Sequence, residues 1–84
     1  MKDCLITFRS VTMAQRGERL LMKANIRCAL RRTPKWMEAK GCGYSLRVRQ
    51  QEALRCAELL REHQIPVGKI YLMGENGEAQ ELVI

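Results

Sequence analysis

The stretch YSLRVRQQEALRCAELLREHQ, residues 44–64, changes from one periodicity to another and decides which fold we expect. In its first five residues, apolar side chains alternate with Ser45 and Arg47, which predicts a half-buried β-strand. From residue 50 onward, small and apolar side chains recur at helical spacing, and Pro66 follows, so we predict a helix over 50–64. A strand followed directly by an amphipathic helix indicates a mixed α and β architecture.

The rest of the chain supplies the other elements of such an architecture. CLITF (4–8) predicts a first strand, and Thr12 is placed to cap a helix over 13–24. Gly17 falls on the apolar stripe of that helix, which indicates close packing of the helix on the sheet. We expect further strands at IRCALRR (26–32) and KIYLM (69–73), a long loop at TPKWMEAKGCG (33–43), and a return of AQELVI (79–84) beside the preceding strand.

The element order β-α-β-β-α-β predicts an α+β fold of the ferredoxin-like kind. In this plan both helices cover one face of an antiparallel sheet, and the C-terminal segment adds an optional extra strand. Residues 1–84 suffice for a single domain. We expect the core beneath the two helices to include Leu21, Leu46, Cys56, Ala57 and Leu60.

The chain carries a net charge of +6, so an anionic partner has to be considered. If the even-numbered residues of the second and third strands face the helices, the other sheet face presents Ser45 together with the arginines Arg27, Arg31, Arg47 and Arg49. These arginines form either a solvated surface or a surface that attracts anions, and the pattern leaves both interpretations open. Weak, non-specific binding of nucleic acid follows from the second.

Three of the four cysteines, Cys4, Cys28 and Cys56, fall inside apolar, regular stretches and are expected to pack in the core. They contain no close C-x-x-C pair, and His63 is the sole histidine, so we expect no metal site and no cofactor. No Ser/His/Asp set indicates independent hydrolysis. The N-terminus lacks the apolar region of a signal peptide and no apolar run has membrane-spanning length, so we expect a cytoplasmic protein without a membrane partner.

The fourth cysteine, Cys42, lies between Gly41 and Gly43 in the predicted loop. The two glycines leave the thiol without bulky neighbours and let successive backbone N–H groups turn toward one anionic atom. Lys40 is two residues away, and positive charge lowers the pKa of a thiol. The pattern indicates either a reactive thiolate or a plain turn whose cysteine fills a gap.

The order of these elements, with RRTP at the end of the second strand and CGYSLRV after the loop, resembles the family of selenium/sulfur carrier-like proteins, small bacterial domains. The residues that carry the resemblance are Pro34 with the basic Lys35, and the Cys-Gly pair Cys42 and Gly43. Between Trp36 and Gly41 the chain departs from the small and hydroxyl residues that are usual in the family.

The resemblance implies a carrier or accessory protein more than an independent enzyme. Cys42 would accept sulfur or selenium as a persulfide or selenosulfide from a donor enzyme, such as a cysteine desulfurase, and pass it to an acceptor enzyme. The alternative is a non-catalytic binding module that uses the basic sheet face for RNA, protein or a small molecule. A second copy of the chain is a further candidate partner.

Overall fold

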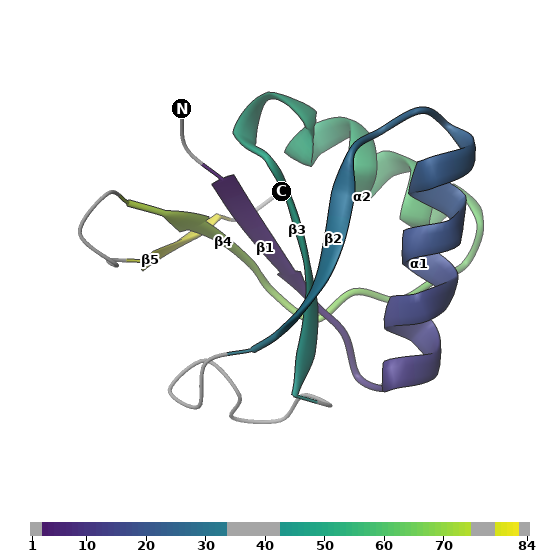
Figure 1. Ribbon diagram of the computed structural model, residues 1–84, viewed down its shortest axis with the longest axis horizontal. Helices are drawn as coiled ribbons and strands as arrows, with labels where there is room; N and C mark the ends of the chain where they lie inside the picture. Colours follow the sequence, from purple (N-terminus) through teal and green to yellow (C-terminus); the bar gives the residue numbers. More distant parts are fainter. Residues whose placement is uncertain (1–2, 34–42, 75–78, 83–84) are drawn as a thin grey trace.

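The computed structural model describes residues 3–33, 43–74 and 79–82 of the 84-residue chain. These residues form five strands and two α-helices (Figure 1). In chain order they are β1 (Asp3–Thr7), α1 (Val11–Lys23), β2 (Cys28–Arg32), β3 (Tyr44–Arg49), the 3₁₀ turn η2 (Gln50–Glu52), α2 (Ala53–Glu62), β4 (Ile70–Met73) and β5 (Ala79–Leu82). Within these ranges no helix has the length and apolarity needed to span a membrane.

The strands form one antiparallel sheet in the order β2-β3-β1-β4-β5. In the central strand β1, Ile6 is opposite Leu46 of β3 on one side and Ile70 of β4 on the other. Helix α1 joins β1 to β2, which run parallel with β3 between them, and α2 joins β3 to β4 across β1 in the same way. The predicted α+β class and the predicted return of the C-terminal strand are confirmed, since β5 pairs with β4.

Both helices lie on the same side of the sheet, and the β4–β5 hairpin extends away from them (Figure 1). Alternate strand residues such as Cys4, Ile6 and Val48 join residues of both helices in one apolar cluster. All five residues expected beneath the helices are buried, which confirms the predicted register: Leu21, Leu46, Cys56, Ala57 and Leu60.

Helix α1 begins at Val11, two residues before the predicted start, because its N-cap is Ser10 and not Thr12. The Ser10 side-chain oxygen accepts a hydrogen bond from the Met13 N–H at 3.2 Å. Both hydroxyl residues are good N-caps, and the earlier one gives the helix additional backbone hydrogen bonds. The expected close packing of Gly17 on the sheet is confirmed, since a Cβ atom there would lie 3.3 Å from the Leu46 side chain of β3, and it would also lie 3.1 Å from the Leu60 side chain of α2.

Candidate functional site

The segment predicted to carry the reactive thiol is described only at its two ends. Pro34, Lys40, Gly41 and Cys42 lie outside the described residues, and their roles stay predictions. Thr33 follows β2 at one end of the segment, and Gly43 precedes β3 at the other.

A backbone hydrogen bond joins these two ends. The Thr33 N–H donates to the Gly43 carbonyl oxygen at 2.8 Å and extends the β2–β3 ladder by one residue pair. The sheet therefore holds Gly43, the residue that follows Cys42 in the sequence.

Gly43 has a positive φ of 83°, in the left-handed region that side chains with a Cβ rarely adopt. It is also buried, directly before the first residue of β3. The chain therefore requires glycine at the position that connects the cysteine to the strand.

Two buried hydroxyl groups lie at the same end of the sheet. Thr33 is 5% exposed and Ser45 is fully buried, and neither side-chain oxygen has a hydrogen-bond partner. Ser45 is opposite Thr7 of β1 and Arg31 of β2 in the sheet register. The expectation that Ser45 faces outward to solvent is therefore wrong, although its position on the face away from the helices is as predicted.

Unpaired buried hydroxyls are uncommon, because each one loses its hydrogen bonds to water. Sequence reasoning did not single out Thr33 or Ser45 as site residues. The available signal was weak: Thr33 is a hydroxyl residue that opens the predicted loop, and Ser45 is a hydroxyl residue two positions after its end.

The predicted basic sheet face is distributed along the full length of β2 and β3. Arg27 precedes β2 and Arg49 ends β3, so both lie about 20 Å along the strands from Gly43. They line one shallow depression together with Glu52. Arg27 and Arg49 are therefore remote from Thr33 and Gly43, the two ends of the Cys42 segment.

The other two arginines, Arg31 and Arg47, lie closer to the two ends of the Cys42 segment. The Arg47 Nε donates to the Asp3 carboxylate at 2.8 Å, so part of its charge is neutralised at the surface. Arg31 is exposed, and it is opposite Ser45 in the register. Of the four arginines, Arg31 is therefore the nearest to the segment's ends.

The three described cysteines are poor nucleophiles. Cys4 and Cys56 are fully buried in the core, as predicted, while Cys28 is half-buried against it and its Sγ donates to the Glu18 carbonyl oxygen at 3.8 Å. Burial is the main cause that raises the pKa of Cys4 and of Cys28 above 9.0, and burial raises the pKa of Cys56 to about 12. At neutral pH these thiols are protonated and therefore unreactive. In the described part of the chain, no three His, Cys, Asp or Glu residues are grouped to hold a metal ion.

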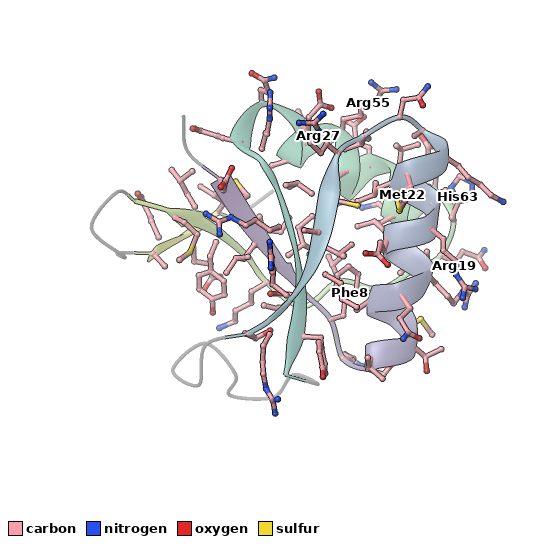
Figure 2. The ribbon with its side chains drawn as sticks, viewed as in Figure 1. Phe8, Arg19, Met22, Arg27, Arg55 and His63 are labelled. Carbon is pink, nitrogen blue, oxygen red and sulfur yellow. The ribbon has the colours of Figure 1, made fainter. Side chains whose placement is uncertain are left out.

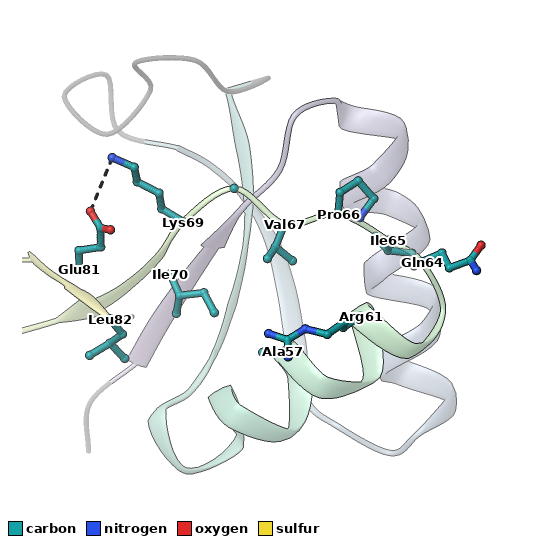
Figure 3. Close-up of a pocket in the computed structure, with 11 residues that line it drawn as sticks. Ala57, Arg61, Gln64, Ile65, Pro66, Val67, Lys69, Ile70, Glu81 and Leu82 are labelled. Carbon is teal, nitrogen blue, oxygen red and sulfur yellow. Dashed lines mark ion pairs between the residues drawn. The ribbon is translucent and has the colours of Figure 1, made fainter. Parts of the chain in front are cut away.

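A separate cavity of about 630 Å³ lies between the end of α2, the connection to β4, and the β4–β5 hairpin (Figure 3). Its lining is largely apolar, with Val67 and Ile70 on one wall and Arg61 extending from α2. Lys69 and Glu81, also in the lining, form an exposed ion pair at 3.6 Å. The cavity's lining includes none of the residues predicted for the site.

The comparisons with known proteins give one match. Residues 3–72 match the family described as "Putative Se/S carrier protein-like". No curated protein and no solved structure matches the chain significantly. The match covers every element from β1 to the third residue of β4, including both ends of the Cys42 segment. The chain therefore belongs to the Se/S carrier protein-like family.

Proposed function

We propose that the protein carries sulfur or selenium on Cys42. The observation that carries this proposal is the full or partial burial of the three described thiols in a chain of the Se/S carrier protein-like family. Cys4, Cys28 and Cys56 are withdrawn into or against the core, and their raised pKa values keep them protonated. Cys42 is therefore the remaining candidate for a thiol that a second protein can reach.

The transfer is a thiol exchange in which electrons balance without an external oxidant. The Cys42 thiolate attacks the outer sulfur of a donor's cysteine persulfide, a new S–S bond forms, and the donor cysteine leaves as a thiolate. With a selenosulfide donor, the bond formed joins sulfur to selenium. An acceptor nucleophile then attacks the outer atom and releases the Cys42 thiolate.

Several features of the segment's ends support this role. The Thr33–Gly43 hydrogen bond and the left-handed Gly43 hold the two strand ends that flank the Cys42 segment. The unpaired Ser45 hydroxyl can donate a hydrogen bond to an anionic sulfur or selenium atom, and Arg31 is the nearest of the sheet arginines. In this proposal Pro34, Lys40 and Gly41 shape the segment and its charge.

The partners of such a carrier are a donor enzyme that forms a persulfide, such as a cysteine desulfurase, and an acceptor enzyme. The fold we assign is the ferredoxin-like one, in one domain. The parallel pairs β1/β2 and β3/β4, each split by an antiparallel strand, support that assignment.

The test is intact-mass spectrometry after incubation with a cysteine desulfurase and cysteine, without reductant. We expect a gain of one sulfur atom that dithiothreitol removes and that peptide mapping assigns to Cys42. Cys42→Ala should abolish the gain, and the matched variant Cys28→Ala should retain it. Loading that persists in Cys42→Ala, or that maps to Cys28, would show that the assignment is wrong.

A further inference from the structure

A basic groove lies between α1 and the end of α2, on the helical side of the molecule. We use this name for the depression of about 320 Å³ that is lined by Arg16, Arg19, Leu20, Lys23, His63 and Ile65. Figure 2 shows Arg19 and His63 at the outer edge of the helical layer. No residue of the groove belongs to the proposed carrier site.

The three cations share one side of α1 because they are spaced by three and four residues. All three are exposed, and none of them forms an ion pair with a carboxylate of the described residues. Glu18 lies on the opposite side of the helix, where its charge contributes to the raised pKa of Cys28. The positive charge of Arg16, Arg19 and Lys23 is therefore concentrated and uncompensated.

The other wall of the groove is built by the end of α2. The His63 Nδ1 lies 3.0 Å from the Leu59 carbonyl oxygen, which can only accept, so Nδ1–H is the donor and the ring is held against the end of α2. The Ile65 N–H donates to the Leu60 carbonyl oxygen at 2.9 Å and fixes the turn that follows. The buried Ile65 and the half-buried Leu20 complete the lining, so the groove is preformed.

We propose that the basic groove binds consecutive phosphate groups of single-stranded RNA. The row from Arg16 to Lys23 extends about 10 Å along the helix axis, which is longer than one phosphate group requires. A strand presents phosphates at regular intervals along its length, and a row of unpaired cations complements that spacing. Guanidinium groups also bind phosphate with two parallel hydrogen bonds. The proposal goes beyond the carrier function and does not depend on Cys42.

The groove differs from the surface that the sequence indicated for nucleic acid. On the sheet, Arg47 is paired with Asp3. Arg27 and Arg49 line a depression that also contains Glu52. The groove has three cations and no acidic residue in its lining. Charge complementarity therefore favours the helical side over the sheet.

The experiment measures fluorescence anisotropy of a labelled mixed-sequence RNA dodecamer at a series of salt concentrations. The groove variant is Arg16→Gln/Arg19→Gln/Lys23→Gln, and the matched control Arg27→Gln/Arg31→Gln/Arg49→Gln removes the same charge from the sheet. We expect the groove variant to weaken binding at low salt by about tenfold or more and to reduce the slope of log K against log salt by about 2. The control should weaken binding by less than about threefold, and Cys42→Ser should bind like the parent.

Three results would overturn the proposal: no RNA binding at low salt, an equal or larger loss in the sheet control, or displacement of RNA by polyglutamate at equal charge concentration. The last result would mean that the groove recognises an acidic protein. All the arginine and lysine substitutions are at exposed positions, and thermal unfolding monitored by circular dichroism checks that each variant is folded. If a triple variant is unfolded, Arg19→Gln and Arg31→Gln are compared instead. Loss of RNA binding with intact sulfur loading would separate this proposal from the carrier function.

Discussion

Thr7 and Lys69 are joined by three hydrogen bonds. The Thr7 N–H donates to the Lys69 carbonyl oxygen at 2.8 Å, and the Thr7 hydroxyl accepts from the Lys69 N–H at 2.7 Å and donates to the same carbonyl oxygen at 3.1 Å. Next to them, the Gly68 N–H donates to the Thr7 carbonyl oxygen at 2.7 Å. The start of β4 is thus fixed to the end of β1, and with it one wall of the cavity beside α2.

The substitution of valine for threonine should change the free energy of unfolding differently at Thr7 and at Thr33, where both hydroxyls are buried. Thr7→Val removes two hydrogen bonds and leaves the Lys69 N–H without its partner, so we expect the free energy of unfolding to fall by about 1–3 kcal/mol. Thr33→Val removes a hydroxyl that has no partner, so we expect a change near zero or a gain in stability. Urea unfolding measures both, and equal losses in the two variants would contradict the prediction.

Gly68→Ala should destabilise the protein, because the new Cβ would lie 2.6 Å from the Thr7 Oγ1, which its two hydrogen bonds hold in place. We expect a loss of about 1–3 kcal/mol. Gly17→Ala is the comparison: its Cβ would be 3.1 Å or more from carbon atoms of side chains, and alanine gains about 1 kcal/mol in helix propensity. A smaller loss in Gly17→Ala than in Gly68→Ala, measured by thermal unfolding, is the expected order.

Gly43→Ala forces a residue with a Cβ into the left-handed region and should cost about 1–2 kcal/mol. If Gly43 holds Cys42 in position for transfer, the rate of sulfur loading should fall while the variant is still folded. Gly17→Ala serves as the control, since it adds a Cβ in helix α1, away from the segment's ends. Parental loading by Gly43→Ala would show that the left-handed residue serves stability alone.

Alkaline pH should weaken the fold through Cys56. Burial raises its pKa from 9.0 to about 12, so above pH 9 the unfolded thiol releases its proton while the folded one keeps it. The unfolded state then binds fewer protons, and the free energy of unfolding falls as pH rises from 9 toward 12, by up to about 1.4 kcal/mol per pH unit. Denaturant unfolding between pH 9 and 11 should give a shallower decline for Cys56→Ala. Parallel declines in the two proteins would mean that Cys56 does not contribute.

The fold followed from patterns that the chain displays locally. The alternation in residues 44–48 predicted the buried face of β3, and the apolar stripe predicted the buried face of α2. This was possible because the periodicity that defines a strand or helix also determines which side is buried. The close packing at Gly17 could be predicted for the same reason, because Gly17 is a small residue on an apolar stripe. The choice of Ser10 over Thr12 could not be predicted, because both residues can cap a helix and the local sequence pattern does not distinguish them.

For the candidate site, too, local patterns predicted some features and the tertiary structure decided the others. The sequence by itself determined the order of the elements, the core cysteines and the glycine-flanked Cys42, since these depend on residue type and spacing. Only the tertiary structure decided which charges and hydroxyls lie together. Thr33 and Ser45 become buried neighbours of one sheet end, Arg47 meets Asp3 across 44 residues, and Arg16, Arg19 and Lys23 meet His63 across two helices. Such groupings depend on strand register and on the packing of distant segments, which no local pattern encodes.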